Sequence, residues 1–162
     1  MGTAPAGSVT VLGVGNPIMG DDGVGLELLA AVRAARPSPS VEFVDGGTGG
    51  MELLPVVQTA SHLLILDAVA GDNPGTVVRL DGDQIPRLLA AKLSPHQMGL
   101  LDVFAAARLL GREPGIVAVV GVVPAAVEVR LGLTPAVAAG LDEATAVACA
   151  VLDDWLAEGA GG

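Results

Sequence analysis

Residues 9–25 read VTVLGVGNPIMGDDGVG, an apolar run followed by a glycine-rich loop that ends in two adjacent carboxylates. The run Val9–Val14 is nearly continuous in apolar residues, which is typical of a strand that helices cover on both faces. The loop therefore follows the carboxyl end of a buried strand, where open α/β sheets build their sites. This stretch predicts an α/β fold whose first loop carries chemistry at Asp21 and Asp22.

The glycines of this loop do not match a phosphate-binding motif. A dinucleotide fingerprint needs its third glycine at position 18, where Ile18 stands, and a P-loop needs a lysine and a hydroxyl after Gly20. Asp21 and Asp22 fill those two places instead, and two carboxylates would repel a phosphate. They suit a metal cation or a water molecule that is to be activated. Either aspartate alone fits a helix N-cap equally well.

The composition narrows the class of protein. With 162 residues, of which 51% are hydrophobic, we expect a single α/β domain over residues 1–162 with flexible ends at 1–7 and 159–162. The formal charge of −10 argues against nucleic acid and anionic membranes as partners, because both bind basic surfaces. Met1–Ser8 lacks the features of a signal peptide, and the apolar run Ile116–Val127 is too short to span a bilayer. We expect a cytoplasmic protein.

Along the rest of the chain, short apolar runs typical of buried strands alternate with segments whose apolar residues recur at helical spacing. This pattern predicts strands that alternate with helices. The predicted strands are 9–14, 41–44, 62–66, 76–80 (an edge strand) and 116–123, and the predicted helices are 24–36, 51–59, 83–91, 95–110, a short one from Pro135, and 142–157. This order predicts a three-layer α/β sandwich of about five mostly parallel strands, flanked by helices on both faces and joined by right-handed crossovers.

Acidic or imidazole side chains lie at three places where a strand ends or a helix starts. Asp21 and Asp22 follow the first strand, Asp67 follows the third strand, and His96 lies in the first turn of the helix that Ser94 would cap. Two carboxylates and one imidazole suit a divalent ion such as nickel or zinc and leave a coordination position open. The alternatives are that Asp67 only ends its strand and that His96 only helps to cap its helix.

Two other reactive side chains are interpreted as structural. Cys149 lies within the apolar pattern ATAVACAV and is the single cysteine of the chain, so we expect it to fill the core. His62 stands at the start of a strand with no carboxylate near it in the sequence. Neither residue is expected to take part in catalysis.

The chain closely resembles the hydrogenase maturation endopeptidases, which trim the C-terminal extension of the large subunit of nickel-iron hydrogenases. The resemblance covers most of the chain and rests on five motifs in family order: GVGNPIMGDDGVG at 13–25, DGGTGG at 45–50, LILDAV at 64–69, SPHQMGLLD at 94–102 and LGLTPAV at 131–137. It implies that Asp22, Asp67 and His96 bind metal and form the catalytic group. It also implies that Asp45, Gly46, Gly47 and Thr48 handle substrate, although turn formation alone would explain those glycines equally well.

The resemblance further implies an aspartic-type, nickel-dependent endopeptidase that acts as a monomer on the precursor of a hydrogenase large subunit. The nickel would be carried by the substrate, with zinc or cadmium able to replace it in vitro, and the three protein ligands would complete its coordination. Water could be activated by the ion or by Asp22 or Asp67 as base. The segment GVVPAAV at 121–127 departs from the family, because relatives often carry Glu or Gln around this proline.

Two rival functions remain open from the sequence. One is a non-catalytic nickel-sensing or scaffold protein that binds the immature hydrogenase subunit through the same three residues. The other is an unrelated metal-dependent aminopeptidase or hydrolase of small substrates, which would hold a tightly resident metal.

Overall fold

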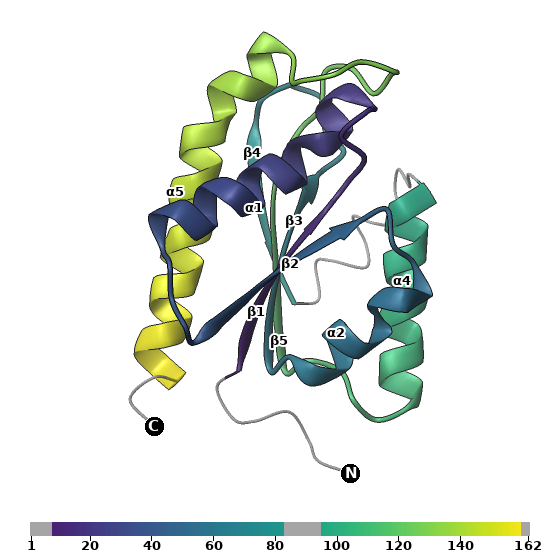
Figure 1. Cartoon of the computed structure of the whole chain (residues 1–162), viewed down its shortest axis with the longest axis vertical. Coiled ribbons are helices and arrows are strands. Elements are labelled where there is room, and N and C mark those ends of the chain that lie inside the picture. Colours follow the sequence, from purple (N-terminus) through teal and green to yellow (C-terminus); the bar gives the residue numbers. More distant parts are fainter. Residues whose placement is uncertain (1–7, 83–94, 160–162) are drawn as a thin grey trace.

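In the computed structural model, a five-stranded sheet forms the centre of the molecule (Figure 1). The structure describes residues 8–82 and 95–159, and within this part the side chains of residues 95–99 and 101 are not described. The strands are β1 (Val9–Val14), β2 (Val41–Gly47), β3 (His62–Ala68), β4 (Val77–Asp81) and β5 (Ile116–Val122), and their order in the sheet is β2-β1-β3-β5-β4. All neighbours run parallel except β4, which pairs antiparallel with β5 at one edge.

Helices cover both faces of this sheet, as the sequence predicts. The helices α1 (Val24–Ala35) and α5 (Pro135–Gly159) pack on one face; the short 3-10 helix η2 (Met51–Leu53), α2 (Leu54–Thr59) and α4 (Pro95–Leu109) lie on the other (Figure 1). The predicted three-layer α/β fold is confirmed.

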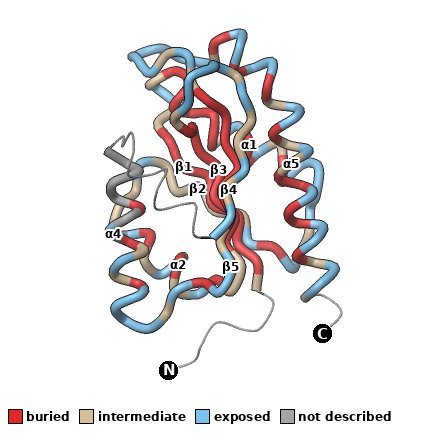
Figure 2. Tube along the Cα trace, turned by 180° about the vertical axis from the view of Figure 1, so that it is seen from behind, coloured by how far each residue is buried: buried red, intermediate tan, exposed pale blue. Residues whose placement is uncertain are grey.

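Alternate residues of one strand enter the two halves of the core. Leu64 and Leu66 of β3 pack with α1 and α5, whereas Leu63 and Ile65 pack with α2 and α4. Both faces are thus apolar, which is why the central strands read as continuous apolar runs. Figure 2 shows these strands as the buried centre of the molecule.

Several element boundaries differ from the prediction. β2 continues through Asp45 and Gly46 to Gly47 because its main chain keeps pairing with β1 beyond the apolar residues. The helix predicted over 51–59 starts as the 3-10 turn η2. The helix predicted over 83–91, the capping residue Ser94 and the ends 1–7 and 160–162 lie outside the described residues.

The two helices predicted after residue 134 are a single helix, α5, so that prediction was wrong. Gly140 lies inside this helix, where α5 crosses the turn that contains Gly75. A Cβ atom at Gly140 would lie 2.6 Å from the carbonyl oxygen of Gly75, and a Cβ atom at Gly75 would collide with the carbonyl oxygen of Ala136. The glycine therefore serves close packing between two main chains.

The part of α5 from Pro135 to Glu158 is long and apolar enough to cross a membrane, and it is the one described helix that meets this criterion. Core helices of α/β proteins meet the same criterion. In this fold Val137, Val151 and Leu152 are fully buried in the core cluster that α5 shares with α1 and the sheet. Its apolar length is thus explained by packing on the sheet.

Cys149 and His62 occupy structural positions. Cys149 is 4% exposed within α5, and burial raises the pKa of its thiol above the usual value. The ring of His62 packs edge-on against Trp155 with 5.3 Å between centroids, and its Nδ1 lies 3.0 Å from the hydroxyl of Ser61.

We predict that Gly140→Ala destabilises the protein even though alanine is the better helix former. The propensity gain is about 1 kcal/mol, and the overpacking against the Gly75 carbonyl costs about 1–3 kcal/mol. Urea unfolding should therefore show a net loss of stability. Gly115→Ala is the control: its added Cβ would meet only the carbonyl oxygen of Ser61, at 3.9 Å, so stability should stay within about 0.5 kcal/mol of wild type. A Gly140→Ala variant more stable than wild type would contradict the packing argument.

Candidate functional site

Asp22 lies at the carboxyl end of β1, in the short 3-10 helix η1 (Gly20–Gly23). Its side chain is 6% exposed, and its Oδ2 accepts a hydrogen bond of 3.0 Å from the main-chain N–H of Asn16. Gly15 has φ +142°, and a Cβ atom there would collide with the carbonyl oxygen of Asp22. The loop can fold back and hold this carboxylate because a glycine stands at its start.

Asp67 lies near the carboxyl end of β3, and its side chain is 2% exposed. Its Oδ1 accepts a hydrogen bond of 2.8 Å from the N–H of Ala68. The start of α1 fits tightly against this point, because a Cβ atom at Gly25 would collide with the carbonyl oxygens of Val14 and Leu66 and lie 3.0 Å from the Cα of Asp67. Since η1 leads directly into α1, the main chains that carry Asp22 and Asp67 meet at the same edge of the sheet.

The neighbouring residue Asp21 has a different role from Asp22. It is fully buried, and its carboxylate accepts four hydrogen bonds from the segment before α5. Oδ2 accepts from the N–H of Ala125 (2.9 Å), the N–H of Ala126 (3.0 Å) and the hydroxyl of Thr134 (2.7 Å), while Oδ1 accepts from the N–H of Thr134 (2.7 Å). We call this network the Asp21 clamp. It fixes the loop after β5 against the loop after β1.

The clamp keeps the carboxylate ionised. Burial by itself would raise the pKa of Asp21, but the hydrogen bonds from Thr134, Ala126 and Ala125 favour the charged form and leave its pKa below the ordinary value of 3.8. Of the two adjacent aspartates, Asp21 is therefore the structural one. The residue pattern alone left this choice open, and the family resemblance implied Asp22 as the metal ligand.

The clamp needs no polar side chain in the segment 121–127. Ala125 and Ala126 reach Asp21 through their main-chain N–H groups, so this contact needs no polar side chain at either position. Gly121 has a further requirement, because it pairs with Asp67 in the sheet and a Cβ atom there would collide with the side chain of Val69.

The segment Asp45–Thr48 lies beside the first loop. Gly13 pairs with Asp45 in the sheet, and the N–H of Gly15 donates to the carbonyl oxygen of Gly47 (2.8 Å). The Oδ1 of Asp45 accepts a hydrogen bond from the N–H of Gly47 (3.0 Å), which shapes the turn. Asp45 and Thr48 are exposed, whereas Gly46 and Gly47 are half-buried. The segment thus borders the edge that carries Asp22.

His96 lies in the first turn of α4, where the sequence predicts it. α4 packs next to η2, which follows β2, and Figure 1 shows that α4 starts on the side of the molecule toward which β1 and β2 run. The side chain of His96 lies outside the described part of the structure. Within the described part, no three His, Cys, Asp or Glu side chains come together as a metal-binding group.

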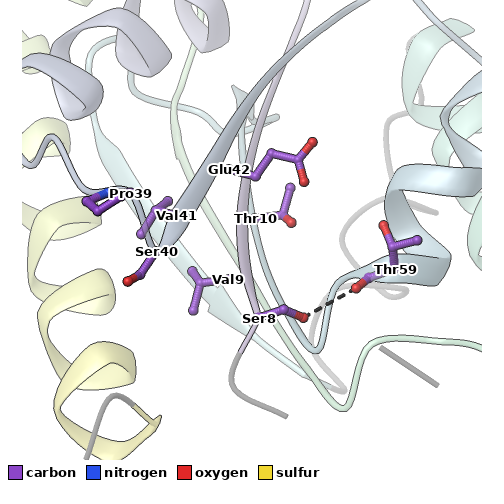
Figure 3. Close-up of a pocket in the computed structure, with 8 residues that line it drawn as sticks. All are labelled: Ser8, Val9, Thr10, Pro39, Ser40, Val41, Glu42 and Thr59. Carbon is purple, nitrogen blue, oxygen red and sulfur yellow. Dashed lines mark hydrogen bonds between the residues drawn. The ribbon is translucent and has the colours of Figure 1, made fainter. Parts of the chain in front are cut away.

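A cavity of about 480 Å³ lies at the opposite edge of the sheet, at the amino ends of β1 and β2 (Figure 3). Ser8, Thr10, Glu42 and Thr59 are among its lining residues, and the hydroxyl of Ser8 donates to the carbonyl oxygen of Thr59 (3.3 Å). This cavity contains none of the predicted site residues. The carboxyl edge, with Asp22 and Asp67, remains the candidate site.

Comparison with known proteins links this architecture to one family. Residues 9–151 match the family model described as hydrogenase maturation protease (HycI). The chain is 41% identical over 139 residues to the hydrogenase 2 maturation protease of Escherichia coli K12, an alignment that covers 84% of this chain and 85% of the relative.

Solved structures agree with this match. The chain superposes on the hydrogenase maturating endopeptidase HybD from E. coli with a TM-score of 0.84 and 38% identity, covering 90% of this chain and 92% of the other. It also resembles the NiFe hydrogenase maturation protease HybD from Thermococcus kodakarensis, with a TM-score of 0.70, 28% identity and coverage of 86% and 95%.

We predict that Asp21→Asn lowers the free energy of unfolding by about 2–4 kcal/mol at pH 7, because the amide cannot accept all four hydrogen bonds and loses their charge assistance. The difference from wild type should depend on pH. Since the folded-state pKa is lowered, the stabilisation is fully present above the unfolded pKa near 3.8 and is lost as pH falls through the folded pKa.

Denaturant unfolding of both proteins between pH 3 and 7 measures this difference. Asp142→Asn is the control, because Asp142 is exposed on α5 and its replacement should leave stability within about 0.5 kcal/mol of wild type at every pH. A constant difference between Asp21→Asn and wild type down to pH 3 would speak against an ionised clamp.

Proposed function

The chain belongs to the hydrogenase maturation protease family and is a peptidase, and from that premise we propose that it removes the C-terminal extension of a nickel-iron hydrogenase large-subunit precursor. The substrate class comes from the relatives, whose names describe maturation proteases of hydrogenase 2 and of NiFe hydrogenases. The observation that carries the proposal is the placement of Asp22 and Asp67, two buried carboxylates, where η1 and β3 meet.

The donor set suits a divalent cation. Buried carboxylates are costly unless hydrogen bonds or a cation compensate them, and carboxylate oxygens together with an imidazole nitrogen are ligands that nickel and zinc accept. Asp22 and Asp67 would supply the oxygens, and His96 at the start of α4 would supply the nitrogen. Three protein ligands leave at least one position for a group from the substrate.

Nickel in this proposal is part of the substrate. An open site with three protein ligands binds free metal weakly and gains its ion only when the precursor presents it. Cleavage would then report that nickel insertion is complete, and a precursor without nickel would be spared. This reading distinguishes the protein from a hydrolase with a tightly resident metal.

The bond-breaking step needs a base close to the scissile carbonyl group of the substrate. A water molecule attacks the scissile carbonyl carbon, the carbon–nitrogen bond breaks, and the proton removed from water passes to the leaving amine. Asp22 or Asp67 takes that proton as base, while the substrate-borne ion orients the chain end. The turn at 45–48 would bind the main chain of the substrate next to this point.

We predict that Asp67→Asn and His96→Ala remain folded but lose processing of nickel-loaded precursor by at least about a hundredfold, because each removes a proposed ligand. Gel electrophoresis detects the shortened large subunit, and mass spectrometry detects the released peptide. His62→Ala is the matched control: it removes the packing against Trp155 and so costs some stability, but cleavage should persist. Wild-type cleavage by His96→Ala would refute the role of that histidine.

A second prediction concerns metal content. After dialysis the purified protein should hold much less than one equivalent of nickel or zinc by elemental analysis, since the ion is expected to arrive with the precursor. A stoichiometric metal that survives dialysis and is required for folding would favour the resident-metal hydrolase instead.

A further inference from the structure

Four large apolar side chains are exposed at the end of the molecule that carries the candidate site. They are Ile18 (54% exposed), Val127 (52%), Val129 (83%) and Leu131 (82%), and we call them the apolar rim. Single exposed apolar residues are ordinary, whereas several on two bonded loops are typical of an interaction surface. Figure 1 shows the loop after β5, which carries three of them, lying beside the loop after β1, which carries the fourth.

Main-chain hydrogen bonds join the two loops. The N–H of Arg130 donates to the carbonyl oxygen of Ile18 (3.0 Å), the N–H of Gly20 donates to that of Arg130 (2.9 Å), and the N–H of Asp21 donates to that of Ala126 (3.0 Å). Together with the Asp21 clamp, these bonds hold the rim in one arrangement. A preformed surface loses little conformational entropy when a partner binds.

A groove of about 200 Å³ continues the rim toward α1. Pro17, Leu26 and Leu133 are among its lining residues, and Gly132 connects it directly to Leu131 of the rim. The exposed residue Glu27 lines the groove as well. The groove is therefore shaped for an apolar side chain, with a carboxylate at its border that favours a basic neighbour.

The rim is continuous with the site. The loop of the rim is bonded to Asp21, which directly precedes Asp22, so a partner that covers the rim lies next to the loop that carries a proposed ligand. A second copy of this chain is the less favourable occupant, because each copy carries a formal charge of −10 and the two would repel. A protein substrate with apolar and basic surface residues fits both the rim and its position.

We propose that the apolar rim and its groove are the docking surface for the folded body of the protein substrate, as distinct from the tail that is cut off. This inference rests on the proposed function, since it takes the substrate to be a hydrogenase large-subunit precursor. The rim would hold the body of the precursor while the tail crosses the edge at Asp22 and Asp67.

The test compares steady-state cleavage of nickel-loaded precursor by wild type and by the double variant Val129→Ser/Leu131→Ser. Both side chains are more than four-fifths exposed, so the variant should fold normally. Loss of two apolar contacts should raise KM about tenfold or more, as for central interface residues, while kcat at saturating precursor stays within about twofold.

The matched control is Leu109→Ser/Leu110→Ser, which removes two leucines that are also exposed, 88% and 60%, at the far end of α4. Its KM and kcat should stay within about twofold of wild type. An unchanged KM in the rim variant would overturn the proposal, and so would an equal rise of KM in the control. If wild type leaves the nickel-loaded precursor uncut, the proposed function itself fails. That result differs from the two KM outcomes that would overturn the docking proposal alone.

Competition separates the body of the substrate from its tail. Mature large subunit without the tail should inhibit wild type and should inhibit the rim variant about tenfold or more weakly; a synthetic tail peptide should inhibit neither. Strong inhibition by the peptide alone would overturn the proposal. Analytical sedimentation measures the oligomeric state of wild type and of the rim variant. If wild type is a dimer, the rim variant is a monomer and both have the same KM, the rim serves self-association and the proposal is overturned.

Discussion

The arrangement of the candidate site depends on one buried carboxylate. Asp21 brings together the turn after β1, the loop after β5 and the start of α5, which are separated by 104–113 residues in the sequence. An ionised carboxylate inside a protein is costly unless hydrogen bonds compensate it, and here main-chain N–H groups and one hydroxyl do so. The buried charge thus joins three segments of main chain through hydrogen bonds.

The two adjacent aspartates have different hydrogen-bond donors. Asp21 points its oxygens at Ala125, Ala126 and Thr134, whereas Asp22 accepts from the N–H of Asn16 within its own loop. One residue orders the surroundings and its neighbour is left at the edge that carries Asp67. Because the two residues share a single turn of main chain, the hydrogen bonds of Asp21 also fix the position of Asp22.

Much of the fold could be predicted from the sequence because the patterns that determine strands and helices are local in the chain. Apolar runs such as Val9–Val14 and periodic helices gave the layers, and the rule that parallel strands end at one edge brought Asp22 and Asp67 together. The clamp could not be predicted, since Ala125 and Ala126 donate through main-chain groups that carry no sequence signal. The two helices predicted after residue 134 are one helix, and the contact that accounts for the glycine within it, between Gly140 and Gly75, has no sequence signal either.

The strands at the two edges of the described sheet differ in composition from the three between them. β2 exposes Glu42 and Asp45, and β4 exposes Arg79 with Asp81 paired to it, so both open edges carry charges. Charged edge strands resist joining the strands of other molecules, which is the first step toward fibrils. The charges on β2 and β4 therefore protect both open edges of the described sheet against strand pairing between molecules.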